Sequence, residues 1–281
     1  MQDINIVFLN YFCKDDILQA VESVIKDIAG SSFAIHITVV DNSNNQDGLR
    51  EALGEKFPGV AYMNTGSNVG FGKGNVVGFK ATPARYYFSL NRDTLIPENS
   101  KTIERLIHFM DSHPKIGCIG PKLINMDGTR QDACYRFDLM SILIKPLKQI
   151  NWDEKYAWVK KHTDRLLMKD FDQNETRPVD WVLGAAMLVR SEVVSAVGWF
   201  DERYFMYLED CDWCKQMWER GWPVYYVHDI IIKHRHARDS AKVSGAVKAL
   251  VKNDLARTHL LSWLKYMWKW RGTHKYYGPV S

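Results

Sequence analysis

The apolar residues in the N-terminal third of the chain alternate between two patterns. Short continuous apolar runs at residues 4–9, 35–40, 60–63 and 85–90 have the length and composition of buried strands. Between them, apolar residues recur at helical spacing, most clearly over 15–28 and again over 71–80. This order of strands and helices predicts an α/β fold with a mostly parallel central sheet flanked by helices.

The second half of the chain combines an interrupted strand with a cluster of acids. The apolar segment 181–190 predicts a strand broken at Gly184 and Ala185, where a ligand or another backbone can approach closely. Three acids then stand among aromatic residues: Glu209, Asp210 and Asp212. Acids in apolar surroundings are costly unless they face solvent or a cation. This segment is therefore a candidate site, although acids also favour a helix start through the helix dipole alone.

Three polar segments directly follow predicted strands, at residues 41–45, 64–75 and 91–94. Because the carboxyl ends of parallel strands meet at one edge of a sheet, we expect these segments to converge on one rim and bind a ligand there. The middle segment is rich in glycine and has two interpretations. It is either a backbone cradle for phosphate or a tight turn that lets a helix pack closely on the sheet. It lacks the Gly-Lys-Ser/Thr ending of a Walker loop.

Two strand ends carry residues suited to a metal and a diphosphate. Asp93, with the side-chain oxygen of Asn91 two residues earlier, can hold a hard divalent cation, although the same triplet also fits an ordinary turn. His234 closes the last predicted strand and is followed by several basic residues. Neutral imidazole suits a metal and the arginines suit phosphate, although a solvated strand edge would look the same.

Composition limits the classes of protein. The 281 residues are 46% hydrophobic and 25% charged with a net charge of +4, which suits one core with an appendage and disfavours a nucleic-acid partner. The five cysteines are scattered, which indicates no disulfide framework and a reducing, cytoplasmic compartment. Cys211 and Cys214 lack a second ligand pair for zinc, so we interpret them as buried structural thiols. We find no signal peptide and no apolar run long enough to span a membrane.

Taken together, these segments resemble glycosyltransferase family 2, and most closely the rhamnosyltransferase-like bacterial enzymes that build surface polysaccharides such as O-antigen and capsule. The resemblance lies in the order and spacing of 39–43, 68–72, 90–93, 184–185, 198–202, 207–212 and His234. It implies a GT-A (Rossmann-like) fold over residues 1–240, with a variable acceptor-side insertion at 138–175. Residues 241–281 would form an amphipathic helical tail.

The resemblance also implies an activity: inverting transfer of a sugar, best matched by L-rhamnose from dTDP-rhamnose, to a glycan or lipid-linked saccharide. Asp210 would be the general base with Glu209 beside it, and Asp93 and His234 would hold Mn²⁺ or Mg²⁺. The residues implied for the nucleotide-sugar pocket are Asn10, Asp41, Asn68, Gly70, Asn75, Asn91, Arg92, Asp93, Arg235 and Arg238. Those implied for the acceptor floor are Trp181, Gly184 and Ala185.

One position departs from the family pattern. The usual metal motif is Asp-x-Asp, whereas this chain has Asn91 at the first position. A neutral amide oxygen replaces a carboxylate, so the site carries one negative charge fewer. The affinity for metal, and strict dependence on it, therefore stay open.

Three other functions compete with this reading. A transferase of the same fold could use a UDP-sugar with galactofuranosyl, galactosyl or N-acetylglucosaminyl as the donor group. A nucleotidyltransferase would need a basic, glycine-rich loop after the first strand, where this chain has residues 10–13 without glycine. A non-catalytic nucleotide- or carbohydrate-binding protein would not need the full set of acids and His234.

The tail segment 260–271 is both aromatic and basic. A helix of this kind can lie at a membrane interface, with Trp and Tyr at headgroup level and Lys or Arg facing anionic lipid. This would place the protein at the inner face of the cytoplasmic membrane, next to lipid-linked acceptors. The alternative is a helix that packs on its own domain or on a second subunit in a homodimer.

Overall fold

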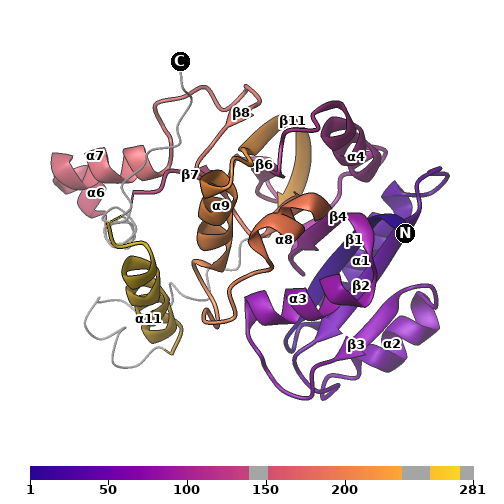
Figure 1. The fold of residues 1–281 in the computed structure, drawn as a ribbon. Helices are drawn as coiled ribbons and strands as arrows, with labels where there is room; N and C mark the ends of the chain where they lie inside the picture. Colours follow the sequence, from indigo (N-terminus) through magenta and orange to yellow (C-terminus); the bar gives the residue numbers. More distant parts are fainter. Residues whose placement is uncertain (139–150, 236–253, 273–281) are drawn as a thin grey trace.

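The computed structural model describes residues 1–138, 151–235 and 254–272. Within these residues a nine-stranded sheet forms the centre of the molecule, in the order β3-β2-β1-β4-β10-β6-β11-β5, with β8 paired to β11 (Figure 1). Its strands are β1 (Gln2–Asn10), β2 (Ile35–Asp41), β3 (Ala61–Asn64), β4 (Ala84–Leu90), β5 (Thr94–Leu95), β6 (Cys118–Ile124), β8 (Arg177–Pro178), β10 (Ala186–Arg190) and β11 (Val224–His234).

The first four long strands are parallel, as the sequence predicts: β1 lies between β2 and β4, and β3 pairs with β2. β6 and β11 are also parallel to each other. Strand β10 differs, because it runs antiparallel to both β4 and β6. The sheet is therefore mixed, and β10 begins at the edge where β4 and β6 end.

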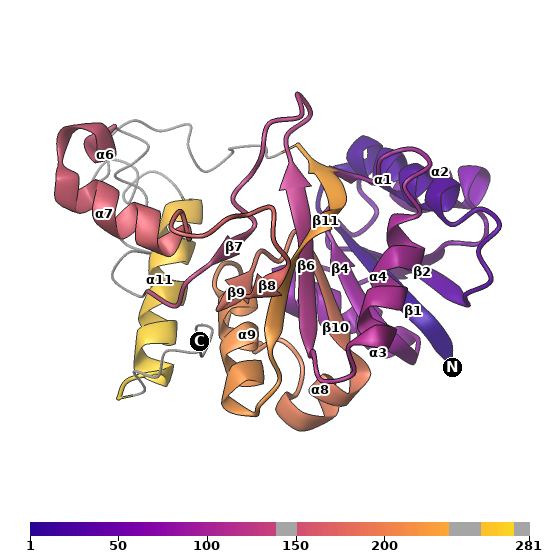
Figure 2. The same ribbon diagram turned by 90° about the horizontal axis from the view of Figure 1, so that it is seen from above.

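The helices lie on both faces and at one end of the sheet. They are α1 (Lys14–Asp27), α2 (Leu49–Lys56), α3 (Phe71–Ala81), α4 (Thr102–Ser112), α6 (Trp152–Lys155), α7 (Ala157–Leu166), α8 (Ser191–Val197), α9 (Glu209–Glu219) and α11 (Asp254–Lys269). Figures 1 and 2 place α3, α8 and α9 on one face, with α1 on the other. Helices α6, α7 and α11 gather at the end of the molecule away from α2.

The glycine-rich segment lets α3 approach the sheet closely. A Cβ atom on Gly74 would lie 2.5 Å from Leu9 Cδ1, and one on Gly78 would lie 2.6 Å from Val7 Cγ1. At Gly78 the contact is with a β-branched side chain on β1, so this position requires glycine, whereas at Gly74 the contact is with the end of a flexible leucine side chain that could shift. These two glycines fit the close-packing interpretation of the segment.

A small two-stranded sheet, β7 (Cys134–Tyr135) with β9 (Trp181–Val182), stands beside the main one. The predicted strand over 181–190 is thus two strands, with the small residues Gly184 and Ala185 at the break. All five cysteines are free thiols, and Cys211 and Cys214 are fully buried as predicted.

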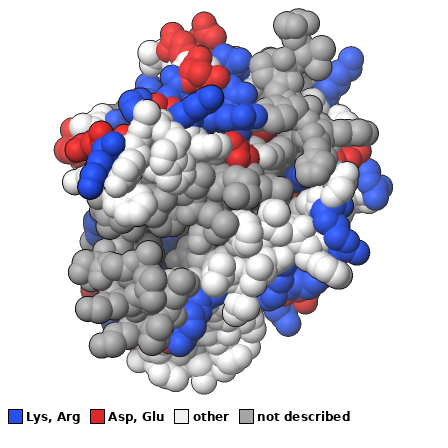
Figure 3. Space-filling model, turned by 90° about the vertical axis from the view of Figure 1, so that its left-hand side faces the viewer, with Lys and Arg blue, Asp and Glu red and all other residues white. Residues whose placement is uncertain are grey.

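The C-terminal helix α11 packs on the domain through one face. Tyr266 is fully buried, and Ser262 Oγ donates to the Met206 carbonyl at 2.7 Å. The opposite face is apolar and exposed: Leu261 is 56%, Leu264 49% and Trp268 69% accessible. Figure 3 looks onto this end of the molecule, where uncharged surface borders groups of Lys and Arg. None of the described helices is long and apolar enough to cross a membrane.

Candidate active site

The polar segments that follow the strands meet at one edge of the sheet. Asn10, the last residue of β1, is paired with Asp41 at the end of β2, and Asp41 is in turn paired with Asn64 at the end of β3. The turn after β4 and the end of β11 reach the same edge because β5 pairs antiparallel with β11. The predicted convergence on one rim is therefore present.

Asp41 is fully buried and accepts five hydrogen bonds from the protein itself. Its donors are Asn10 Nδ2 (2.8 Å), the Ser43 amide (2.8 Å) and hydroxyl (2.6 Å), the Asn45 amide (2.7 Å) and the Tyr62 hydroxyl (2.7 Å). Burial alone would raise the pKa of Asp41, but these donors outweigh it and lower the pKa. Asp41 is thus a carboxylate that organises the loop after β2.

The predicted pocket residues after β3 are also tied to the protein. Asn68 Oδ1 accepts from Asn42 Nδ2 at 3.2 Å and from the Gly70 amide at 3.0 Å. Gly70 has φ +88°, and a Cβ atom there would lie 2.2 Å from the Phe205 carbonyl oxygen. Only glycine fits this position, so it fixes the segment before α9 against the start of α3.

Asn75 faces the sheet instead of the rim. It is buried, its Nδ2 donates to the Phe71 carbonyl at 3.0 Å, and its Oδ1 accepts from the Ser89 hydroxyl at 3.1 Å. Its amide therefore links α3 to β4.

Asp93 and His234 come together because their strand ends are neighbours. His234 is directly opposite Thr94 in the β5–β11 pair, and Nε2 of His234 lies 3.3 Å from Oδ1 of Asp93. Both side chains are almost buried, at 4% and 11% exposed. Burial would raise the pKa of Asp93, but the hydrogen bond and charge of His234 outweigh it and lower the pKa.

This pair suits a divalent cation. Cis ligands about 2.1 Å from an octahedral ion are about 3 Å apart, close to the 3.3 Å observed here. A carboxylate oxygen and an imidazole nitrogen are both ligands that Mn²⁺ accepts. Among the described residues no group of three His, Cys, Asp or Glu forms a metal site. A diphosphate could supply further oxygen ligands to an ion held by this pair.

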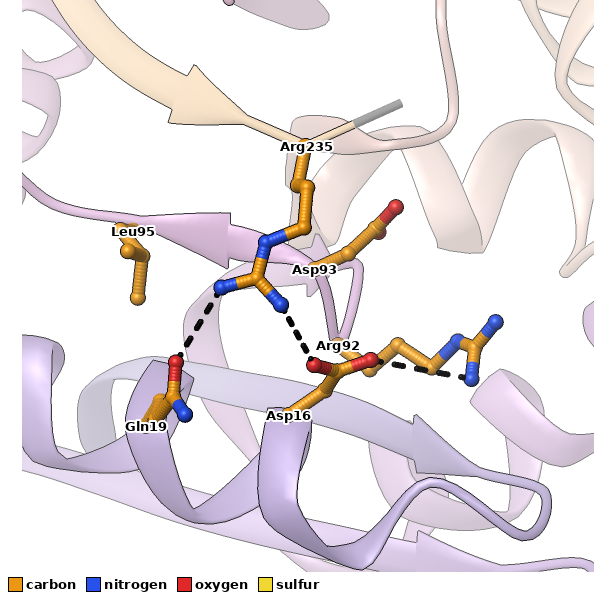
Figure 4. A pocket seen from close by; sticks show the side chains of 6 residues that line it. All are labelled: Asp16, Gln19, Arg92, Asp93, Leu95 and Arg235. Carbon is orange, nitrogen blue, oxygen red and sulfur yellow. Dashed lines mark hydrogen bonds and ion pairs between the residues drawn. The ribbon is translucent and has the colours of Figure 1, made fainter. Parts of the chain in front are cut away.

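The two arginines beside these ligands turn toward helix α1 (Figure 4). Arg235 Nη1 is 2.9 Å from Asp16 Oδ1 and its Nη2 donates to Gln19 Oε1 at 3.2 Å, while Arg92 Nη1 is 4.0 Å from Asp16 Oδ2. The Asp93 carboxylate points away from this cluster in Figure 4. Arg235 is thus engaged by α1 in this structure, and the predicted Arg238 lies outside the described residues.

The backbone of Asn91 secures the turn that carries Asp93. Its amide donates to the Ala185 carbonyl at 2.8 Å, and its carbonyl accepts from Thr94 Oγ1 at 2.6 Å. The predicted acceptor residue Ala185 is therefore fixed directly beside the turn that carries the predicted metal ligand.

Asp210 and Glu209 open helix α9 at the same edge. Asp210 Oδ2 accepts from the Gly184 amide at 2.9 Å, so the small-residue break between β9 and β10 holds the carboxylate. Glu209 is 5% exposed, and its Oε2 has no hydrogen-bond partner among the described residues. Burial and the neighbouring Asp210 charge raise the pKa of Glu209 well above its ordinary value. Burial therefore favours the protonated form of Glu209, whereas the Asp210 carboxylate is held by a backbone amide.

The backbone before α9 is unusual. Tyr207 and Leu208 both adopt left-handed conformations, with φ of +71° and +67°. Side chains rarely take this region, and such strain persists where the surrounding structure holds it. Here the hydrogen bond from the Phe71 amide to the Phe205 carbonyl, 2.8 Å, holds one end of the segment.

On the predicted acceptor side, Trp181 is nearly buried. Its ring stacks on Tyr135 with centroids 4.3 Å apart, and its indole N–H donates to the Arg136 carbonyl at 3.1 Å. Trp181 therefore supports the floor next to Asp210 mainly through packing.

Sequence reasoning missed three groups at this edge. Tyr11 and Phe12 form an exposed aromatic pair after β1, 49% and 50% accessible, and two aromatics directly after a buried strand could have signalled this. Gln131 contacts His234 Nδ1 at 2.8 Å. Lys269 binds Asp212 from the C-terminal helix at 2.6 Å. The last two had no local signal, because their partners are distant in sequence.

Comparison with known proteins agrees with this geometry. A family model described as Glycosyl transferase family 2 matches residues 4–171, more than half of the chain. The N-acetylglucosaminyl-diphospho-decaprenol L-rhamnosyltransferase of Mycobacterium tuberculosis is 26% identical over 223 residues, covering 74% of this chain and 69% of that protein.

Solved structures show the same fold. GalNAc-T7 with UDP, GalNAc and Mn²⁺ superposes with a TM-score of 0.60 at 16% identity, covering 83% of this chain and 44% of that one. The mannosyltransferase PcManGT from Pyrobaculum calidifontis, in complex with GDP-Man and Mn²⁺, gives a TM-score of 0.54 at 11% identity, covering 95% and 72%. The predicted GT-A fold is confirmed, and this chain spans less than half the length of GalNAc-T7.

Proposed function

Because the chain belongs to glycosyl transferase family 2, we propose that it is an inverting enzyme that uses a nucleoside-diphosphate sugar at the rim described above. The observation that carries the proposal is the meeting of the Asp93–His234 pair and the Asp210 carboxylate at one edge of the sheet. The Asp93–His234 pair suits the diphosphate, and the Asp210 carboxylate suits the acceptor hydroxyl. A sugar between them would be attacked on the face opposite its leaving group.

The donor we propose is L-rhamnose carried by dTDP. Support comes from the Mycobacterium tuberculosis relative, whose name states that it is an L-rhamnosyltransferase. The exposed Tyr11–Phe12 pair offers aromatic faces for a nucleobase beside the loop that Asp41 organises. A UDP-sugar is the alternative donor, because none of these contacts selects one pyrimidine or one sugar.

Asp93 and His234 would hold Mn²⁺ or Mg²⁺, and the ion would offset the charge that develops on the departing diphosphate. Two solved GT-A structures similar to this chain contain Mn²⁺. Since Asn91 replaces a carboxylate of the family motif, Asp93 is the only acid this motif contributes.

We propose Asp210 as the base that takes the proton of the acceptor hydroxyl. The backbone amide of Gly184 orients the Asp210 carboxylate. The raised pKa of Glu209 favours its protonated form beside Asp210. In that form the two acids would present one negative charge to the acceptor.

The acceptor we propose is a saccharide, carried by a lipid. The exposed stripe Leu261, Leu264 and Trp268 on α11 repeats at helical spacing, and Lys265 and Arg271 adjoin it. Arg271 lies over the Trp268 ring at 4.0 Å. This mixture of aromatic and basic groups fits an anionic lipid surface, which would hold the enzyme at the inner face of the cytoplasmic membrane.

Co-sedimentation with vesicles containing anionic lipid tests this surface. Leu264→Ala with Trp268→Ala should lower binding, while Phe12→Ala, an exposed aromatic at the end of β1, should not. Equal binding by all proteins would remove the membrane proposal. A wild-type homodimer in solution that the double variant turns into a monomer would assign the stripe to a second copy of the chain instead.

The donor proposal is tested by thermal unfolding with dTDP-rhamnose and with UDP-sugars, each with and without Mn²⁺ or Mg²⁺. A ligand that binds the folded protein raises its midpoint by mass action. A metal-dependent rise with dTDP-rhamnose supports the proposal, and a rise with a UDP-sugar alone moves the enzyme to the alternative donor. No rise with any nucleotide sugar would remove the basis for the donor site.

A further inference from the structure

The two ring nitrogens of His234 face different groups. Nε2 lies 3.3 Å from Asp93 Oδ1, on the side where a cation would sit. Nδ1 lies 2.8 Å from Oε1 of Gln131, a residue that follows the hairpin after β6. A metal-binding histidine needs one nitrogen without hydrogen, and the partner of the other nitrogen decides which one that is.

The orientation of the Gln131 amide is determined by its other contacts. Its Nε2 donates to the His234 backbone carbonyl at 2.7 Å and to Asn125 Oδ1 at 2.5 Å. Asn125 in turn presents its Nδ2 to Thr129 Oγ1 at 2.7 Å, so its oxygen faces Gln131. With its NH₂ group between two oxygens, Gln131 must turn Oε1 toward the imidazole.

An amide oxygen can only accept a hydrogen bond, so Nδ1 of His234 must carry the hydrogen. We infer that Gln131 is a positioning residue that holds His234 in the Nδ1–H form and thereby keeps the lone pair of Nε2 directed at the cation. This inference rests on the proposed role of His234 as a metal ligand. It assigns to Gln131 the part that carboxylates or carbonyls take behind many metal-bound histidines.

The backbone makes this contact rigid. The Gln131 amide donates to the Leu123 carbonyl at 2.9 Å, and Leu123 pairs with Ile232 of β11. Gln131 therefore touches His234 twice, at the ring and at the main chain, from a segment hydrogen-bonded to β6, the strand next to β11. A ring held at both places cannot rotate about its side-chain bonds without breaking the contact.

The first measurement reads the hydrogen itself. The test uses metal-free Asp93→Ala protein, because the Asp93 carboxylate would otherwise compete for the hydrogen at Nε2. With ¹⁵N-labelled histidine in alkaline buffer, where the ring is neutral, proton–nitrogen correlation spectra distinguish Nδ1–H from Nε2–H. We expect His234 to show Nδ1–H in this background when Gln131 is present. Gln131→Met, which has no acceptor oxygen, should shift it to Nε2–H, the form that free imidazole prefers. Gln131→Glu keeps an acceptor and should retain Nδ1–H.

The second measurement is Mn²⁺ binding followed by electron paramagnetic resonance, with no nucleotide present. Gln131→Met should weaken binding by about 10- to 100-fold, the range found when such supporting residues are removed. The matched control is Gln173→Met, because Gln173 is buried and bonded to the Leu167 carbonyl away from the site. That variant should bind Mn²⁺ like the wild type, with its unfolding midpoint measured alongside.

The outcomes distinguish the positioning role of Gln131 from the proposed metal-binding role of His234. If Gln131→Met keeps Nδ1–H and wild-type Mn²⁺ affinity, or if Gln131→Glu loses Nδ1–H just as Gln131→Met does, Gln131 does not position the ring. If His234→Asn binds Mn²⁺ like the wild type, the proposed metal ligand fails. The tautomer measurement still reports on Gln131 in that case, because it needs no metal.

Discussion

Two buried carboxylates, Asp41 on the proposed donor side and Asp212 on the proposed acceptor side, are stabilised in different ways. Both are completely inaccessible. Asp41 is surrounded by neutral donors that come from its own loop and from the two neighbouring strands. Asp212 also accepts from nearby neutral donors, Tyr204 and Gln216, but unlike Asp41 it meets a cation. Lys269 Nζ lies at 2.6 Å and the Trp270 indole at 2.7 Å, 57 and 58 residues further along the chain.

The difference concerns how each half of the site is completed. The loop around Asp41 is built at the ends of the three consecutive strands β1, β2 and β3, and the side-chain partners of Asp41 on the neighbouring strands are 31 and 21 residues away in the sequence. The acceptor side begins at α9 and is completed only when the C-terminal helix packs against it. Asp210, two residues before Asp212, lies between these cases, because its carboxylate accepts from the Cys211 amide of its own helix and from the Gly184 amide at the break between β9 and β10.

The largest expected effect belongs to Asp210. Asp210→Asn should lower turnover by about 10³-fold, within the range for a general base, while the Kd for the donor changes little. Glu209→Gln is the matched control, because an amide resembles the protonated acid that burial favours at this position, and the change should cost less than about tenfold. The two variants are compared by their turnover and by calorimetric measurement of donor affinity. Equal losses in both variants would mean that the two acids act as one unit.

The next effect tests the dependence of α9 on the C-terminal helix. Lys269→Met leaves the Asp212 charge buried without its cation, which should lower the free energy of unfolding by about 3 kcal/mol. Lys265→Met, one turn earlier, removes only a contact with the Arg203 carbonyl and should cost less than about 1 kcal/mol. Denaturant unfolding measures both. Adding Asp212→Asn to Lys269→Met should restore part of the loss, and no recovery would show that the ion pair is not the cause.

A smaller, pH-dependent change in the free energy of unfolding is expected at Asp41, on the proposed donor side. Tyr62→Phe removes one donor to the Asp41 carboxylate and should cost about 1–2 kcal/mol at neutral pH. The pKa of Asp41 is lowered in the folded protein, so its stabilisation is present above the unfolded value of about 3.9 and is lost as pH falls toward the folded one. The difference between variant and wild type should therefore shrink in acid.

The control for that change is Tyr11→Phe, which removes an exposed hydroxyl from the same edge of the sheet. Its free energy of unfolding should match the wild type at every pH. A Tyr62→Phe difference that stays constant into acid would mean that the hydroxyl acts through packing and not through the charge of Asp41.

The smallest expected effect asks what Arg235 does. Asp16→Asn releases Arg235 from α1, and if Arg235 can reach a diphosphate, the Kd for dTDP or UDP should fall by about threefold. Asp15→Asn makes the same charge change one residue earlier on an exposed position and should alter the Kd less. Calorimetric titrations at two salt concentrations compare them. Identical behaviour would assign Arg235 to the fold alone.

Much of the donor side was predictable, because a polar residue after a buried strand has only one edge to occupy. Asn10, Asp41 and Asp93 follow from that rule. Asn75 was expected in the pocket, but α3 approaches β4 closely enough for its amide to bond Ser89. The sequence did not predict that β10 runs antiparallel to its neighbours, because an apolar run has the same pattern in either direction.

The acceptor side was less predictable for a physical reason. Burial of Asp212 depends on Lys269 and Trp270, and no local pattern connects residues so far apart. Gln131 has no motif either, because a glutamine after a hairpin is ordinary until a histidine ring is placed beside it. Sequence identifies the acids, and only packing identifies the groups that orient them.

The reversed strand β10 has a consequence for how this enzyme can diversify. β6 runs toward the proposed catalytic edge and β10 runs away from it, so the chain between them leaves and returns at that edge. Among the described residues of this stretch, the two residues of β8 rejoin the main sheet through β11. The rest of the stretch can be lengthened at little cost in closure entropy. Its sequence can therefore change to suit new acceptors while the long strands keep their register.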